Sequence, residues 1–372
     1  MSKNFTVVIA TSLALSTQFQ AALSSPTTDP AATEYKGKDA LPLVSASATA
    51  LRAQVTKLSL LAMMSPFTPS AIAGILTAVN ESVLPSLVTA ALLVTPNKYT
   101  KAFHTEINTL SKTTLKEFSA LVEEVKLIAK QTDEAKREGK DDKDITKPDL
   151  TLSTGRVWDA CDRLNDLVAK GVVGFVIRRV EEWRDLVRDA MEEIEEWDPE
   201  EGDDFFDDLI GEEGKADEDQ QNDDDGDDDD DQDTAALLAH KKATLRFLKP
   251  VVQMYSVVVV NRLRITGGIS LEPSENIAKL ESLMANLQSI PDQVDEAAGA
   301  LYEDNTDGLI RHMKQVKSHA ANAVDILVSP WSTKKDARAK SSTEDKFAMW
   351  SKAWVKVLRE VTRWLDETPD KA

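Results

Sequence analysis

An acidic segment of 36 residues divides this sequence. Residues 198–233 contain 21 Asp or Glu residues and one basic residue, Lys215, so they carry the whole formal net charge of −20. Like charges at this density repel one another. Apolar burial here is too small to offset the entropy of ordering the backbone, so we predict a disordered acidic linker at 199–233. The large apolar side chains in this segment are Phe205, Phe206, Leu209 and Ile210.

The predicted linker separates residues 1–198 from residues 234–372, and each part is long enough to bury a core of its own. Hydrophobic residues make up 42% of the chain, but only 14 of its 372 residues are glycine. That balance favours helices over a sheet rich in turns. We therefore predict an all-α protein of two antiparallel helical bundles joined by the acidic linker.

Hydrophobic periodicity locates the helices. The clearest pattern covers 171–197, where apolar residues recur at spacings of three and four and the opposite face carries Arg and Glu pairs. Pro85 lies inside another predicted helix and is expected to kink or split it. The run VVQMYSVVVV at 251–260 has strand propensity, but its helical flanks favour a fully buried helix. Further helices are predicted at about 5–24, 43–64, 69–95, 98–131, 153–169, 234–265, 273–290, 292–303, 306–328 and 343–367.

The N-terminal stretch has some features of a secretory signal. An apolar run follows Lys3, and small residues lie near Ala21 and Ala22. Thr and Ser residues interrupt this run, however, and its apolar positions form a helical stripe, which favours a first core helix. No stretch reaches about 18 uninterrupted apolar residues, so we expect no membrane span. The single cysteine, Cys161, permits no intramolecular disulfide and favours a reducing, intracellular compartment.

Residues with catalytic or metal-binding chemistry are few. Cys161 lies on an apolar helical stripe, which favours a buried structural thiol over a nucleophile. His312 and His319 are two helical turns apart, about 10.5 Å along the axis, too far to share a metal without other ligands. His104 and Glu106 fit the first half of a zinc deaminase signature, but the required cysteines are missing. With no glycine-rich phosphate loop or basic aromatic patch either, we expect no enzyme, cofactor, metal or direct nucleic-acid contact.

The most distinctive segment is TLSTGRVWDACDRLNDLV at 151–168. Ser153 or Thr154 can cap a helix there, and the apolar spacing directs Val157, Trp158, Cys161 and Leu164 toward a core. Polar neighbours, among them Asp162, are expected at the edge of that core. The pattern predicts a well-packed helix in which Trp158 anchors the first bundle.

This segment, with VRDAMEEIEE at 187–196, resembles the VW-x-x-CD motif and acidic helix of the cyclin-D-binding family, also called Grap-and-cyclin-D-interacting proteins. VTKLSLLAMMSPFTPSAI at 55–72 and VLPSLVTAALLV at 83–94 are similar to its fungal branch. The resemblance marks Val157, Trp158, Cys161 and Asp162 as a structural motif. It implies an all-helical, non-enzymatic protein of the cytoplasm and nucleus. Such a protein binds D-type cyclins and basic helix-loop-helix transcription factors and regulates the cell cycle and transcription.

Other functions remain open from the sequence. Arg246, Phe247 and Leu248 form an Arg-x-Leu tripeptide of the kind that docks to cyclins, although the prediction places it in a helix. Helical bundles also build cytoskeletal scaffolds of the vinculin and α-catenin type. The acidic segment could instead shield basic proteins such as histones in a chaperone-like role.

Overall fold

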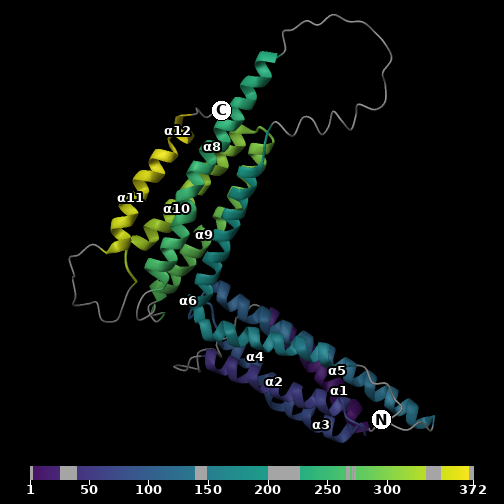
Figure 1. Ribbon diagram of the computed structural model, residues 1–372. Coiled ribbons are helices and arrows are strands. Elements are labelled where there is room, and N and C mark those ends of the chain that lie inside the picture. The colour runs from purple at the N-terminus through teal and green to yellow at the C-terminus, as the bar shows by residue number, and fades with distance from the viewer. Residues whose placement is uncertain are drawn as a thin grey trace, which may run out of the picture. The chain divides into compact units, whose positions relative to one another are not determined.

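A computed structural model describes residues 3–25, 40–138, 149–199, 227–264, 269, 271, 274–331 and 345–367, with only the backbone at 227–233 and 367. Every regular element in these ranges is a helix, which confirms the all-α prediction (Figure 1). Contacts divide the chain into two compact units, Met1–Phe175 and Val176–Ala372. Each unit has its own apolar core.

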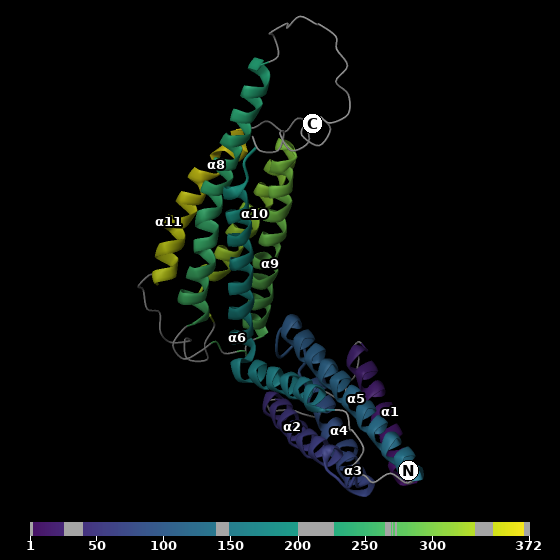
Figure 2. The same cartoon turned by 45° about the vertical axis from the view of Figure 1, so that its right-hand side comes forward.

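The first unit is built from α1 (Lys3–Ser24), α2 (Leu41–Met63), α3 (Pro69–Ala78), α4 (Leu84–Leu93), α5 (Lys101–Arg137) and the start of α6 (Thr151–Glu196). Helix α1 packs along α5, and α2 packs against α3 and α4 (Figure 2). The core is rich in aromatic side chains, as in the edge-to-face contact of Phe103 with Phe175, whose ring centroids are 5.6 Å apart. Aromatic and aliphatic stripes from separate helices therefore meet in one core, as the periodicity predicts.

Pro85 is accommodated without a break in the chain's helical path. A π-helical turn, Val79–Val83, joins α3 to α4, and Pro85 lies in the first turn of α4. Proline has no N–H to donate there, and a wider π turn relieves the clash of its ring with the preceding turn. The expected kink or split is thus a local change of helical pitch.

The boundary between the units lies within α6, at a different place from the predicted boundary at 198. Gly171 has φ 63° and ψ −172°, a conformation that L side chains rarely adopt, and it interrupts the helical backbone. Residues from Val176 onward pack in the second unit: the Trp197 ring lies 4.9 Å from that of Tyr302, and Lys241 Nζ donates to the Glu195 carbonyl at 3.0 Å. The apolar stripe at 176–197 therefore belongs to the second core.

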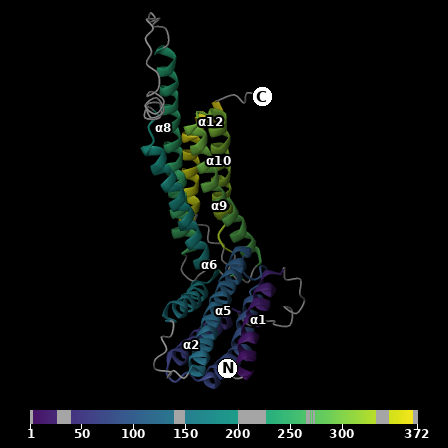
Figure 3. The same ribbon diagram turned by 90° about the vertical axis from the view of Figure 1, so that its right-hand side faces the viewer.

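The second unit continues with α8 (Asp227–Val258), α9 (Ser274–Tyr302), α10 (Thr306–Val328), α11 (Lys346–Val361) and α12 (Arg363–Glu367), and a π turn, Val259–Leu263, extends α8. Figure 3 shows α9 and α10 side by side, in agreement with their extensive packing. The 251–260 run is helical, as predicted, but it is not fully buried: Tyr255 has no exposed surface, whereas Val260 at the end of the run is 61% exposed. The two helices predicted at 273–290 and 292–303 form one helix that passes through Pro291.

The predicted linker at 199–233 is only partly described. Residues 200–226 lie outside the described residues. Helix α8 begins at Asp227, so the last part of the predicted linker is helical, which corrects the expected helix start at 234.

Arg262 connects three segments of the second unit. Its side chain is 7% exposed, Nε donates to the Leu327 carbonyl at 2.7 Å, and the Asp345 carboxylate lies 2.8 Å from the guanidinium. Asp345 also caps α11 by accepting from the Ala348 amide. Although desolvation opposes it, the hydrogen bonds from Ala348 and Arg262 lower the pKa of Asp345. A buried cation is tolerated here because acceptors surround it.

Three helices are long and apolar enough to cross a membrane by length and composition alone. They are Lys3–Ser24, Pro69–Leu93 and Thr234–Leu263, of which 22%, 50% and 50% of the apolar windows are buried. This differs from the sequence expectation, which required an uninterrupted apolar run. The mean hydropathy of an 18-residue window can stay high although Thr and Ser residues interrupt the apolar run.

Candidate partner-binding surface

Helix α2 and the first part of α6 run antiparallel and are joined by polar contacts, which we call the α2–α6 seam. Residue numbers rise along α2 as they fall along α6. Such contacts fix the register of the two helices and satisfy their hydroxyl and amide groups, which range from half-buried to buried. The pairs are Ser45 Oγ with Asn165 Oδ1 (2.8 Å), Trp158 Nε1 with Thr56 Oγ1 (3.1 Å) and Ser59 Oγ with Thr154 Oγ1 (2.6 Å).

Trp158 lies half-buried in this seam, at the edge of the core, and its role as an anchor of the first bundle stays a prediction. Its indole N–H donates to the Thr56 hydroxyl, and the Arg52 guanidinium carbon lies 5.1 Å from its ring centroid. Arg52 Nε also pairs with Asp162 Oδ1 at 3.2 Å. The helical turn that directs Val157 and Cys161 inward rotates Trp158 toward α2, where its N–H has a polar partner.

Val157 and Cys161 lie in the core, each with no exposed surface. Desolvation, with a smaller contribution from the Asp162 carboxylate, raises the pKa of the Cys161 thiol to about 12. The thiolate is the nucleophilic form of cysteine, so Cys161 is chemically inert at neutral pH. This agrees with the predicted structural thiol. The sequence motif thus contains two core residues, Val157 and Cys161, and two seam residues, Trp158 and Asp162.

Large apolar side chains are exposed where α2 ends and α6 begins, and we call them the apolar seam end. The Ser59–Thr154 hydrogen bond joins the two helices at this point. Leu152 is 73% exposed and Met64 58% exposed, high fractions for such side chains. Contiguous exposed apolar side chains can mark protein-binding sites, and methionine adapts to varied partners, so these residues are a candidate contact surface. The apolar seam end consists of Leu60, Met63, Met64 and Leu152.

Arg52 and Thr56 were missed by sequence reasoning, although they are central to the seam. They lie four residues apart in a helix whose other faces are mostly apolar. That spacing places them on one face, next to the polar positions of α6. The spacing was a usable signal for a polar contact, but it does not identify the facing helix.

The histidines considered as metal ligands make structural hydrogen bonds. His104 Nδ1 donates to the Val94 carbonyl, and its Nε2 accepts from Asn108 at 3.1 Å. His312 and His319 donate to Gln293 and Asn286 of α9 at 2.9 and 3.2 Å. Across the described ranges, no group of three or more His, Cys, Asp or Glu side chains is arranged to hold a metal ion.

The Arg-x-Leu tripeptide is not available as a docking peptide in this fold. Phe247 and Leu248 are fully buried, and Arg246 pairs with Glu360 of α11 at 3.7 Å. Docking motifs of this kind work as extended, exposed peptides, and this tripeptide is part of the core of the second unit.

Comparison with known families gives one match. Residues 43–200 match the model of the domain described as Grap2 and cyclin-D-interacting, N-terminal. The match begins within α2 and passes through all of α6, so it includes the seam and the motif residues. No curated protein matches the chain. The matched stretch agrees with the resemblance seen in the sequence, and similarity to the fungal branch stays a prediction.

Proposed function

We propose that this chain is a non-enzymatic regulator that binds a protein partner through the apolar seam end. The observation that carries the proposal is the match of residues 43–200 to a cyclin-D-interacting domain. The same stretch contains exposed Leu60, Met64 and Leu152, which offer surface for a partner.

A helical partner suits this surface best. Two antiparallel helices leave a shallow groove between them, and an amphipathic helix binds such a groove through apolar anchors one or two turns apart. Arg52 and Trp158 lie along the seam from the apolar end, and Arg and Trp are common in the residues that contribute most to binding. D-type cyclins and basic helix-loop-helix factors are helical proteins, so both are candidate partners. A role in the cell cycle and transcription, in the cytoplasm and nucleus, is part of this proposal.

The proposal is tested by measuring binding of the full chain to a purified D-type cyclin and a helix-loop-helix domain. Leu60→Glu with Leu152→Glu places two charges in the apolar seam end and should weaken binding about tenfold or more. The control is Leu186→Glu, because Leu186 is 53% exposed but lies on the second part of α6, in the other unit. Equal loss in the control, or no loss in the double variant, would contradict the assignment of the surface.

The acidic segment favours a second candidate, a shield for basic proteins. It concentrates 21 carboxylates within 36 residues, and such a tract attracts cationic surfaces. Binding through it should fall steeply between about 50 and 200 mM salt, in contrast to binding at an apolar surface. Deleting residues 200–226 from the full chain distinguishes the two functions: the seam proposal expects partner binding to survive, and the shield requires its loss.

A further inference from the structure

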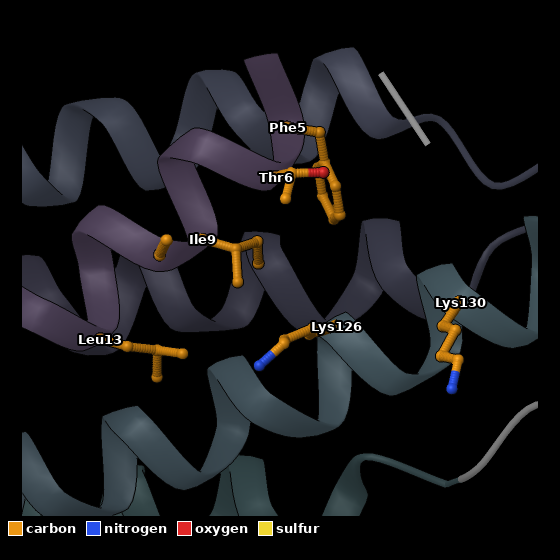
Figure 4. A pocket seen from close by; sticks show the side chains of 7 residues that line it. Phe5, Thr6, Ile9, Leu13, Lys126 and Lys130 are labelled. Carbon is orange, nitrogen blue, oxygen red and sulfur yellow. The ribbon is translucent and has the colours of Figure 1, made fainter. Parts of the chain in front are cut away.

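A cavity of about 390 Å³ opens between α1 and α5. Figure 4 shows Phe5, Ile9 and Leu13 projecting from α1 and the two lysines from α5. Helix α1 lies outside the stretch that matches the cyclin-D-interacting domain. Helix α5 lies inside that stretch, but neither helix contributes to the apolar seam end, so the site is distinct from the proposed partner-binding surface. The lining residues used below are Phe5, Ile9, Leu13, Lys126 and Lys130.

The apolar wall of the cavity is anchored to the core. Phe5 and Ile9 are 1% and 3% exposed, and the Phe5 ring makes an edge contact with Phe67 at 6.2 Å. Leu13 is only partly buried and can contact an apolar group that enters the cavity.

Lys126 and Lys130 supply positive charge at the opposite side. They are one helical turn apart, about 6 Å along the axis, so both ammonium groups can reach one anionic group. Among the lining residues they alone carry charge. Lys126 pairs with Glu123 at 2.9 Å and Lys130 with Glu134 at 3.9 Å, and all four side chains are half or more exposed. Such exposed pairs are weak, and each ammonium keeps further protons to donate.

We propose that this cavity binds an anionic amphiphile with a single aliphatic chain. The chain lies against Phe5, Ile9 and Leu13, and its carboxylate or phosphate contacts Lys126 and Lys130. A volume of 390 Å³ is within the range of about 300–1,000 Å³ typical of small-molecule sites, which are mostly apolar with a few placed polar groups. Lysine binds a phosphate or a carboxylate as a point charge, so either headgroup can be held without a fixed bidentate geometry.

The test is calorimetric titration of the full chain with dodecanoate, dodecyl phosphate and dodecylamine, each below its micelle concentration. One equivalent of an anionic ligand should bind, and dodecylamine should bind about tenfold more weakly or not at all. The two anions distinguish a carboxylate site from a phosphate site. Equal binding of dodecylamine would overturn the proposal, and so would the absence of binding by both anions.

A matched pair of lysine variants sharpens this test. Lys126→Gln with Lys130→Gln should weaken binding of the preferred anion about tenfold. Lys112→Gln with Lys116→Gln removes the same charge at the same spacing on the same helix, outside the cavity lining, and should leave binding unchanged. Equal effects of the two pairs would overturn the proposal.

The apolar wall is tested by Leu13→Asp, which should abolish binding of the anions while the helical circular dichroism is retained. Cosedimentation of the full chain with phosphatidylserine vesicles examines the remaining alternative. Binding to vesicles without binding of monomeric amphiphile would indicate a membrane-surface contact instead of this site, and it would overturn the proposal.

Discussion

Tryptophans of the two units make different contacts. Trp354 and Trp331 of the second unit are 3% and 5% exposed, and their indole N–H groups donate to backbone carbonyls of Pro250 and Arg262 at 2.9 and 2.7 Å. Trp158 of the first unit is half-buried and donates to a side-chain hydroxyl. A tryptophan bonded to buried backbone stabilises the fold, whereas one bonded to a surface side chain can exchange that contact for a partner. The comparison teaches that the motif tryptophan lies at the edge of its core, where its N–H meets a side chain of α2.

The largest expected effect concerns Trp354. Trp354→Ala should cost about 3–5 kcal/mol in the free energy of unfolding, because it removes a fully buried aromatic side chain and leaves the Pro250 carbonyl without its donor. Urea unfolding followed by circular dichroism measures this loss. Met349→Ala on the same helix is the control, since Met349 is 52% exposed. A loss below about 1 kcal/mol for Trp354→Ala would remove the contrast with Trp158.

The second largest loss of stability is expected for a substitution of Arg262. Arg262→Met keeps an apolar stem against the Phe347 ring, which lies 4.3 Å from the guanidinium carbon, but it removes the hydrogen bonds to Leu327 and Asp345. We expect destabilisation of about 1.5–3 kcal/mol, typical of hydrogen bonds to a charged group. The same urea titration measures it. Unchanged stability would show that the guanidinium contributes only apolar packing.

Trp158 should have a smaller effect on stability and a larger one on binding. Trp158→Ala loses one hydrogen bond and a cation–π contact, so about 1–2 kcal/mol of stability is expected. Trp158→Phe retains most of the ring contact and isolates the hydrogen bond. Thermal unfolding and partner titration are compared for both variants. A stability loss as large as that of Trp354→Ala would instead confirm Trp158 as an anchor of the first bundle.

The pH dependence of the second unit should reflect Asp345. Its pKa is lowered in the folded chain, so its ionised form stabilises the fold above the unfolded value of about 3.9, and that contribution is lost as the pH falls through the folded pKa. Asp345→Asn should reduce this acid sensitivity. Urea unfolding at several pH values from neutral to acidic compares the two proteins. If the stability of both proteins depended on pH in the same way, Asp345 would be excluded as the source of the acid sensitivity.

The smallest effect, an almost complete lack of chemical modification in the folded protein, is expected at Cys161. Burial and a raised pKa of about 12 should keep this thiol unmodified by iodoacetamide in the folded protein near pH 8. Mass spectrometry with and without urea measures the modification. Rapid labelling in the native state would show that the core around Val157 and Cys161 opens readily.

Helices were predictable because each depends on a local pattern. The helix predicted at 306–328 has those bounds in the structure, where Asn305 caps it by accepting from the Gly308 amide at 2.9 Å. The path through Pro291 was not predictable, because proline alone indicates a break and only packing against α10 retains the helix.

The candidate site was only partly predictable. Periodicity placed Val157 and Cys161 in the core, but it also assigned Trp158 there, since a wide apolar stripe does not show which of its members lies at the edge. Likewise, the apolar stripe at 176–197 was evident in the sequence, but the pattern does not identify which helices pack against it. Contacts with Tyr302 and Lys241 assign it to the second unit.

Hydrogen exchange of the full chain with and without a D-type cyclin tests the proposed binding surface most directly. If the apolar seam end binds the partner, amides at 56–64 and 151–158 should gain protection, and amides of α9 and α10 should keep their rates. Protection confined to α9 and α10, or binding without added protection at 56–64 and 151–158, would contradict it.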